Sequence, residues 1–355
     1  MPQRSQSEAA HPVLVEVTRG DRVESRHRGS IAVVTPSGKL VGSAGDPDAF
    51  HFLRSSAKPF QLAPFVASGR FDEYQLGTEA LAIMAASHSG EDRHMRTVQT
   101  ILRNAGVPSS ALQCGTQAPF DRETERRLTR EGQPPTVLRH NCSGKHTAMV
   151  LFAKASGWPM ETYFERDHPV QRLALETISA LSDVPIEQVA TAVDGCGVVT
   201  FGMPLRGLAT AFARLADPSA VADPLLREAL TRIRDAMLEH PELVAGTQRL
   251  DTALMQSYPG RVVSKGGAEG VLAMGVLAGA VKDGSTPLGV AAKIEDGNLG
   301  RRGGDVVACE TLAQLGLGEP ARPERLAEFA HPLITDPRGE VVGDVRPAFL
   351  LATPR

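Results

Sequence analysis

Hydrophobic and polar positions divide the chain into three stretches, with strand patterns at both ends and helix patterns between them. The expected strands, which are short, apolar and rich in β-branched residues, are 13–18, 31–35, 39–43, 261–264 and 288–294. The turn sequence Pro36-Ser37-Gly38 joins the second and third of these as a hairpin. A helix is expected at 268–281. We therefore expect an α+β sandwich in which both ends of the chain form one mainly antiparallel sheet.

The middle of the chain has apolar residues at helical spacing. The expected helices are one that follows the capping sequence Ser89-Gly90-Glu91-Asp92 and runs through Ala105, and four more at 143–156, 169–181, 205–215 and 224–239. The polar stretch 113–135 is expected to be a loop. This pattern predicts a sheet domain made of 1–88 and 258–355, with a mainly helical region at 89–257.

Composition and charge exclude several classes of protein. The 355 residues are 42% hydrophobic with a net charge of -3, so the chain can bury a large core but has no basic surface for nucleic acid or an anionic membrane. The first eleven residues are polar, and the longest apolar stretch, 268–281, is too short to cross a bilayer. We expect a cytoplasmic enzyme without nucleic-acid or membrane partners.

Three segments carry serine and lysine residues in a characteristic order: Ser55-Ser56-Ala57-Lys58, Ser87-His88-Ser89 and Lys265-Gly266-Gly267. Serine enzymes that open amides and β-lactams use an S-x-x-K motif, a second serine motif and a K-x-G strand in the same order. If Ser55 begins a helix, Ser55 and Lys58 share one face of it, because positions i and i+3 are neighbours. This spacing would place a nucleophile beside a base.

A lysine base must be neutral. To act as one, Lys58 needs a pKa lowered from about 10.4 to about 7 to 8, which burial beside other cations can achieve. Lys265 and Arg54 are candidates for those cations. The alternative is a solvated lysine in a first helical turn, and Pro59 disfavours helical geometry at Lys58.

The cysteines suggest a metal. Four cysteines are too few for a disulfide scaffold in so long a chain. Cys142 and Lys145 have i, i+3 spacing, and Cys196 lies in the turn Asp194-Gly195-Cys196-Gly197 after an apparent strand. Two thiolates and one further ligand suit a tetrahedral zinc site with water in the fourth position, with His146 as the conventional alternative to lysine. Two buried cysteines in separate packing environments remain the competing interpretation.

Together, the segments around Ser55, Ser87, Cys142, Cys196 and Lys265 resemble the rhizobial, thermolabile type of L-asparaginase, in family order from Val15 to about Gly304. The resemblance implies a serine β-lactamase-like or glutaminase-like fold, usually as a homodimer. It implies two catalytic pairs, Ser55 with Lys58 and Ser87 with Lys265. It also implies a zinc ion held by Cys142, Lys145, Cys196 and water, and it makes L-asparagine the expected substrate.

The remaining site residues are expected from charge complementarity alone. Arg54, His146 and Asp194 are candidates for holding the carboxylate and ammonium groups of the substrate. Two alternatives stay open. A β-lactam or peptide amidase would share the serine and lysine motifs without needing the cysteines, and a non-enzymatic amino-acid binder could use the same scaffold.

Overall fold

The computed structural model describes residues 11–282, 284–297, 303–318 and 323–353, which form two compact units. The sheet unit consists of Met1–Ser56, Met203–Asp217 and Ala253–Arg355. The helical unit consists of Ala57–Gly202 and Pro218–Thr252. The first crossing from one unit to the other therefore falls inside the first serine motif.

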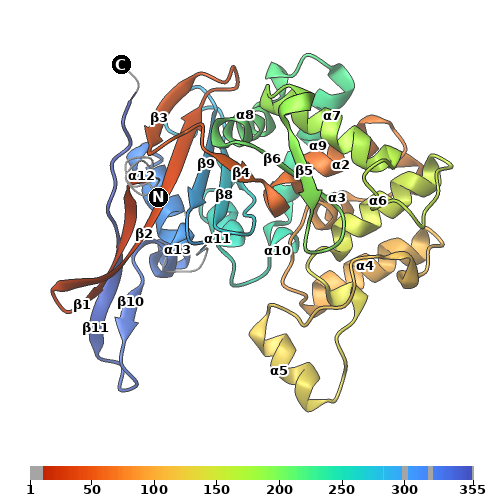
Figure 1. The fold of residues 1–355 in the computed structure, drawn as a ribbon. Helices are drawn as coiled ribbons and strands as arrows, with labels where there is room; N and C mark the ends of the chain where they lie inside the picture. Colours follow the sequence, from red (N-terminus) through yellow and green to blue (C-terminus); the bar gives the residue numbers. More distant parts are fainter. Residues whose placement is uncertain (1–10, 283, 298–302, 319–322, 354–355) are drawn as a thin grey trace, which may run out of the picture. The chain divides into compact units, whose positions relative to one another are not determined.

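One antiparallel sheet of eight strands organises the sheet unit (Figure 1). Its strands are β1 (Val13–Arg19), β2 (Arg22–Val34), β3 (Leu40–Ala44), β7 (Val262–Ser264), β8 (Val271–Val276), β9 (Leu288–Ile294), β10 (Leu333–Thr335) and β11 (Val341–Pro347). Their order is β10-β11-β1-β2-β9-β8-β7, with β3 also paired to β2. Because β1 pairs with β11 and β2 with β9, both ends of the chain build this sheet, which confirms the predicted α+β fold.

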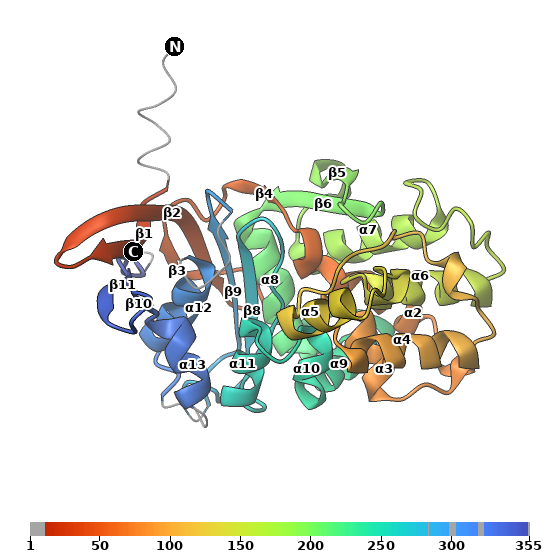
Figure 2. The ribbon, with the colours of Figure 1, turned by 90° about the horizontal axis from the view of Figure 1, so that it is seen from below.

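Helices cover both faces of the central strands. Figure 2 shows α8 (Leu205–Ala216) on one side of the sheet and α12 (Gly304–Gln314) with α13 (Pro323–Ala330) on the other. Two glycines of the sheet allow α8 to approach closely, because a Cβ at Gly289 or Gly275 would collide with the backbone carbonyl oxygen of Ala209 or Phe212. The sheet centre is therefore buried on both faces.

This burial explains one wrong prediction. Residues 268–281 were expected to form a helix, but they contain β8, whose six residues are all buried. A strand that is covered on both faces has a continuous apolar run rather than an alternating one, and such a run is easily mistaken for a buried helix.

The helical unit packs around α2 (Lys58–Ala67), in which every residue from Lys58 to Val66 is buried. The other helices are α3 (Thr78–Met84), α4 (Asp92–Asn104), α5 (Arg122–Arg130), α6 (Ser143–Ala155), α7 (Pro169–Ser182), α9 (Pro224–Glu239) and α10 (Pro241–Val244). Helices α3, α6, α7 and α9 contact α2 directly. A short hairpin of β5 (Ala190–Val193) and β6 (Val199–Pro204) follows α7. Helix α11 (Leu250–Ser257) carries the chain back to the sheet unit.

The predicted helices in this region are confirmed, with two local corrections. Helix α4 is capped by Glu91 and His94, not by Ser89 and Asp92. The stretch 113–135, expected to be a loop, contains α5, which begins after the capping residue Asp121. The charged sequence of α5 leaves only Thr124 and Leu128 buried, so its apolar pattern is too weak to indicate a helix.

The units differ from the predicted domain ranges at residues 57–88 and at Met203–Asp217, which was predicted to lie in the helical region but belongs to the sheet unit. Residues 57–88 were placed with the sheet, whereas α2 and α3 pack on helices and belong to the helical unit. Within the described ranges, no helix is long and apolar enough to span a membrane.

Candidate active site

The first serine motif lies in a tight 3₁₀ turn, Arg54–Ala57, that follows β4 (Phe50–Phe52) in the sheet unit. Arg54 has a φ of 48°, which is uncommon for a residue with a side chain. The two serines of the motif differ in their environments. The Ser56 hydroxyl is fully buried and donates to the Leu53 carbonyl oxygen at 2.7 Å, whereas Ser55 is half-buried. Ser55 is therefore the serine of this turn that a substrate can approach.

The K-x-G motif packs against this turn within the sheet unit. A Cβ at Gly267 would lie 2.7 Å from the carbonyl oxygen of Leu53 and 2.9 Å from the backbone nitrogen of Ser56. No side chain fits there, because both neighbours are backbone atoms. Lys265, just after β7, is almost fully buried, and its backbone N–H donates to the Ala273 carbonyl oxygen of β8 at 2.9 Å. The strand that carries Lys265 and the turn that carries Ser55 thus meet at a glycine.

Lys58 is the first residue of α2 and is fully buried. Pro59 follows it without breaking the helix, because proline is tolerated in a first turn where no N–H partner is needed. The interpretation of Lys58 as a solvated surface lysine is therefore wrong. Its Nζ atom donates to the Ser87 hydroxyl at 2.7 Å, to the Ala86 carbonyl oxygen at 2.7 Å and to the Cys142 Sγ at 3.2 Å.

This environment favours the neutral amine. Burial lowers the pKa of Lys58 below its usual value of 10.5, and the positive charge of Lys145 lowers it further. The thiols of Cys142 and Cys196 act in the opposite direction but do not reverse the effect. Lys58 thus combines a lowered pKa with direct contact to a serine hydroxyl, which is the arrangement that a general base requires.

The second serine motif is a buried extended segment between α3 and α4. Its backbone is fixed on two sides, since the Ser87 N–H donates to the Val244 carbonyl oxygen and the His88 N–H donates to that of Asn141. The His88 ring links this segment to the start of α6 (Ser143–Ala155), because its Nε2 atom lies 2.9 Å from the Ser143 Oγ while its Nδ1 accepts from the Gly90 N–H. The Ser87 hydroxyl is thereby held at a defined position beside Lys58.

Helix α6 begins directly after Cys142 and carries Lys145 and His146 in its first turn. It crosses α3 at very short range, because a Cβ at Gly144 would collide with the carbonyl oxygen of Ile83. The backbone N–H of Cys142 donates to the His140 Nδ1 at 3.0 Å, which fixes the cysteine at the helix start. The glycine of Cys142-Ser143-Gly144-Lys145 thus serves helix packing.

Cys196 lies in the turn of the β5–β6 hairpin, which Gly197 closes with a φ of 89°. Lys145 reaches this turn from α6, with its Nζ 2.9 Å from the Cys196 Sγ and 3.7 Å from the Asp194 Oδ2. The Asp194 Oδ2 also lies 3.6 Å from the Cys196 Sγ. All three residues are buried, so the lysine, the carboxylate and the thiol form one enclosed charge cluster.

The surrounding groups shift the pKa values of Cys142 and Cys196 in opposite directions. A hydrogen bond with Cys196, together with the charges of Lys58 and Lys145, holds the pKa of Cys142 well below its usual 9.0 despite burial. The same hydrogen bond and burial raise the pKa of Cys196. Burial lowers the pKa of Lys145, but Cys196, Cys142 and Asp194 outweigh this effect, so the net shift is upward. These opposite shifts leave Cys142 as the more acidic of the two thiols.

The resemblance assigns a zinc ion to Cys142, Lys145 and Cys196, which all lie in the helical unit, with the Lys145 Nζ 2.9 Å from the Cys196 Sγ. Cys142 and Cys196 are free, and their sulfur atoms are within hydrogen-bonding distance of each other. Within the described ranges, no three residues among His, Cys, Asp and Glu are grouped as a metal site. A zinc ion at this position therefore needs the Lys145 amine as its third protein ligand.

His146 is fully buried next to Lys145 on α6. Its Nδ1 lies 2.5 Å from the Tyr163 hydroxyl, and Tyr163 is itself fully buried in the loop after α6. Burial and the charge of Lys145 lower the pKa of His146 far below 6.5, so the ring is neutral and offers hydrogen bonds rather than a charge. Tyr163 could not be predicted as a site residue, because a single tyrosine in a loop has no diagnostic spacing.

The structure brings together one group of the predicted site residues in each unit. The helical unit gathers Lys58, Ser87, Cys142, Lys145, His146, Asp194 and Cys196. The sheet unit holds Arg54, Ser55 and Lys265. Because Ser87 and Lys265 belong to different units, their pairing stays a prediction. The contact between Lys58 and Ser87 was not expected from the sequence. The two residues belong to different motifs, and the number of residues between the motifs does not show which serine contacts the buried lysine.

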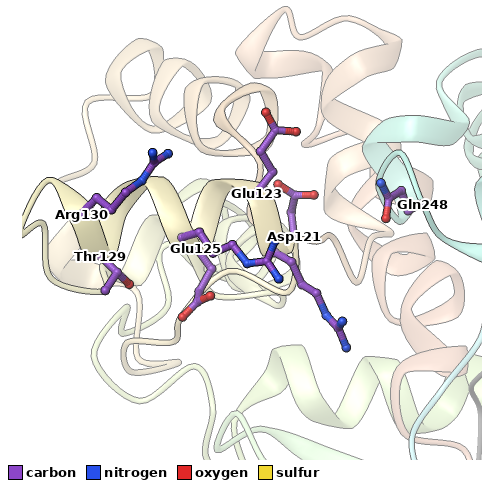
Figure 3. Close-up of a pocket in the computed structure, with 8 residues that line it drawn as sticks. Asp121, Glu123, Glu125, Thr129, Arg130 and Gln248 are labelled. Atoms are coloured by element: carbon purple, nitrogen blue, oxygen red, sulfur yellow. The ribbon is translucent and has the colours of Figure 1, made fainter. Parts of the chain in front are cut away.

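A separate surface hollow of about 950 Å³ lies against α5 in the helical unit (Figure 3). Charged side chains such as Asp121, Glu123, Glu125 and Arg130 line it together with Gln248. It contains none of the residues of the serine, lysine and cysteine motifs. We therefore assign the candidate active site to those motifs and not to this hollow.

Comparisons with known proteins identify the family of this chain. A protein-family model described as L-asparaginase II matches residues 15–347. Among curated proteins, no match was found. The similar solved structures include a probable glutaminase from Bacillus subtilis complexed with 6-diazo-5-oxo-L-norleucine, with 12% identity and a TM-score of 0.41, which covers 82% of this chain and 84% of that one.

Two further solved structures are comparably distant. A Bacillus glutaminase crystallised in the presence of 4.3 M NaCl has 12% identity and a TM-score of 0.40, covering 81% of this chain and 91% of that chain. A β-lactamase from Mycobacterium bovis has 13% identity and a TM-score of 0.38, covering 81% and 95%. At these TM-scores the likeness is remote, and the family assignment rests on the family model alone.

Proposed function

Because this chain belongs to the L-asparaginase II family, whose members are amidohydrolases acting on asparagine, we propose that it hydrolyses the side-chain amide of L-asparagine with Ser55 as nucleophile and Lys58 as base. The observation that carries the proposal is the fully buried Lys58, whose lowered pKa and contact with the Ser87 hydroxyl at 2.7 Å suit a proton acceptor.

The acylation step follows from these roles. Neutral Lys58 accepts the proton of Ser55 as the Ser55 oxygen forms a bond to the side-chain carbonyl carbon of the substrate. The C–N bond then breaks, and the nitrogen leaves as ammonia after taking a proton. Ser87 is placed to pass that proton from Lys58, because its hydroxyl can accept from the amine and donate to the leaving nitrogen.

Deacylation uses the same groups in reverse. A water molecule gives a proton to Lys58 as its oxygen forms a bond to the acyl carbon. The bond between that carbon and the Ser55 oxygen then breaks, Lys58 returns the proton to the Ser55 oxygen, and aspartate is released. Lys265 is proposed to assist Ser87 through its positive charge. Arg54 is proposed to hold the substrate carboxylate and Asp194 its ammonium group, by charge complementarity.

Zinc is proposed to bind Cys142, Lys145 and Cys196 with water as the fourth ligand. A bound zinc ion would supply positive charge that keeps both sulfur atoms as thiolates. The chain's own contribution is positional, since Cys142 also contacts the Lys58 Nζ at 3.2 Å and helps to orient the amine.

The proposed homodimer follows from the resemblance, and light scattering of the purified protein tests it.

Ammonia release separates this function from its alternatives. The purified protein is assayed against L-asparagine, L-glutamine and a chromogenic β-lactam under the same conditions, and its zinc content is measured. We expect turnover of asparagine and zinc in the protein. Hydrolysis of the β-lactam alone would indicate an amidase of another class, and binding of asparagine without ammonia would indicate a binder.

A further inference from the structure

The contact between His146 and Tyr163 determines which ring nitrogen of His146 carries the proton. The Tyr163 oxygen accepts a hydrogen bond from the Gln113 backbone N–H at 2.8 Å and lies 2.5 Å from the His146 Nδ1. A phenol has a single proton. Within the described ranges, His146 is the only acceptor that the structure offers to this buried hydroxyl, so Tyr163 donates its proton to Nδ1.

The tautomer of His146 follows. If Nδ1 carried a proton, the Tyr163 hydroxyl proton would be buried without an acceptor, which is costly. Nδ1 is therefore the acceptor, and the ring proton lies on Nε2. Among the described residues, Nε2 has no hydrogen-bond partner although it is fully buried. A buried donor of this kind requires an acceptor from outside the protein.

We propose that Tyr163 is a positioning residue that locks His146 in the Nε2–H tautomer, and that the acceptor is an oxygen atom of the bound amino-acid substrate. This inference rests on the proposed function for the identity of the ligand. His146 directly follows Lys145 of the charge cluster on α6. A neutral N–H selects a carbonyl or carboxylate oxygen and gives nothing to an ammonium group.

The tautomer can be read without any measurement of activity. In protein labelled with ¹⁵N at its ten histidines, long-range ¹H–¹⁵N correlation spectra distinguish a protonated from a bare ring nitrogen, and the spectrum of His146→Gln assigns the signals. We expect a protonated Nε2 and a bare Nδ1 in the parent protein. Adding L-aspartate, the product, should shift the Nε2 proton signal. A protonated Nδ1, or an Nε2 signal that does not respond to saturating aspartate, overturns the proposal.

A kinetic comparison tests the positioning role. Tyr163→Phe should raise the KM for asparagine about tenfold, the size of one hydrogen bond, while kcat changes little. Tyr74→Phe is the matched control. It removes a tyrosine hydroxyl that donates at 2.9 Å to the carbonyl oxygen of Leu151, which lies on α6 like His146 but is not a site residue. Equal KM values in the two variants would overturn the role of Tyr163. If the protein hydrolyses no asparagine at all, the proposed function fails while the spectra still decide the tautomer.

Discussion

The Nζ atom of Lys58 lies 2.7 Å from the Oγ atom of Ser87, which connects the first and second serine motifs through one hydrogen bond. Lys58 begins the buried helix α2, and Ser87 lies in a segment whose backbone is tied to Val244. Neither group can move away without breaking other contacts. The lysine and the serine of the second motif are therefore held in contact with each other.

Ser87→Ala should lower kcat for asparagine by about 10²- to 10⁴-fold, the usual contribution of a positioned acid or base. The fold should persist, because Lys58 keeps its hydrogen bond to the Ala86 carbonyl oxygen. Ser89→Ala is the control, since its hydroxyl donates to the Ala245 carbonyl oxygen and not to Lys58. Steady-state ammonia release measures both variants. Similar activity in the two would show that Ser87 has no part in proton transfer.

Activity should rise with pH, because only neutral Lys58 can accept a proton and its pKa is lowered from 10.5. The climb in kcat should therefore occur below 10.5, and activity should stay high in alkaline solution. A carboxylate base would already be saturated near neutrality. A kcat profile at saturating substrate that is flat from about pH 6 to about pH 9 would be incompatible with a lysine base.

The same shift has a consequence for stability. Between the lowered pKa of folded Lys58 and 10.5, the unfolded chain binds the proton more tightly than the folded one. The contribution of Lys58 to the free energy of unfolding therefore rises with pH in that window. Lys145, whose pKa is raised, contributes in the opposite sense, so its stabilisation is fully present below 10.5 and is lost above it. Denaturant unfolding of the parent and of Lys58→Met at several pH values in this range gives the difference between their free energies of unfolding, which should change in favour of the parent as the pH rises. A difference that does not depend on pH would show that the pKa of Lys58 is not lowered.

Cys196→Ser should abolish zinc binding, because loss of one thiolate from a site with three protein ligands removes much of its affinity. The parent protein should contain about one zinc ion per chain. Cys309→Ser is the control, since Cys309 is a free cysteine on α12 in the sheet unit and is not one of the predicted zinc ligands. Elemental analysis of the purified proteins gives the result. A well-folded parent protein without zinc would rule out the metal site.

Gly267→Ala should impair catalysis by displacing the turn that carries Ser55. The added Cβ would lie 2.7 Å from the Leu53 carbonyl oxygen, and backbone atoms cannot turn aside as a flexible side chain can. We expect kcat to fall and the free energy of unfolding to drop by about 1 to 3 kcal/mol, the usual cost of overpacking. Chemical denaturation and ammonia release measure the two effects.

The control for that variant is Gly42→Ala in β3. There a Cβ would make ordinary contacts, the nearest being 3.6 Å from Val33. Both glycines belong to the sheet unit, so the pair isolates the close approach at Gly267. If the two variants have equal kcat and stability, the packing of the K-x-G strand against the Ser55 turn is not required.

Much of the fold could be predicted from the sequence, because amphipathic patterns record which face of an element is buried. Helix α9 and strand β9 have the predicted bounds, since clear apolar patterns and turn residues delimit them. The pattern failed at β8, where burial on both faces removes the alternation, and at α5, where a mostly exposed helix has almost no apolar face.

The candidate site was predictable in its residue types but not in its contacts. Motif order singled out Lys58 and Ser87, and i, i+3 spacing singled out Cys142 and Lys145; the structure places all four in the helical unit. The hydrogen bond from Lys58 to Ser87 and the one between Tyr163 and His146 depend on how distant segments pack, and spacing along the chain does not encode that. Spacing along the chain also does not show that Gly267 lies against the backbone of Leu53 and Ser56, where no side chain fits.

Covalent labelling of the nucleophile tests the central claim most directly. A diazoketone analogue of asparagine is incubated with the parent protein and with Lys58→Met, and the modified residue is located by peptide mass mapping. The account predicts one adduct, on Ser55, and its loss in Lys58→Met. An adduct on Ser87, or labelling that is unchanged without Lys58, would contradict the assignment of Ser55 as a nucleophile activated by Lys58.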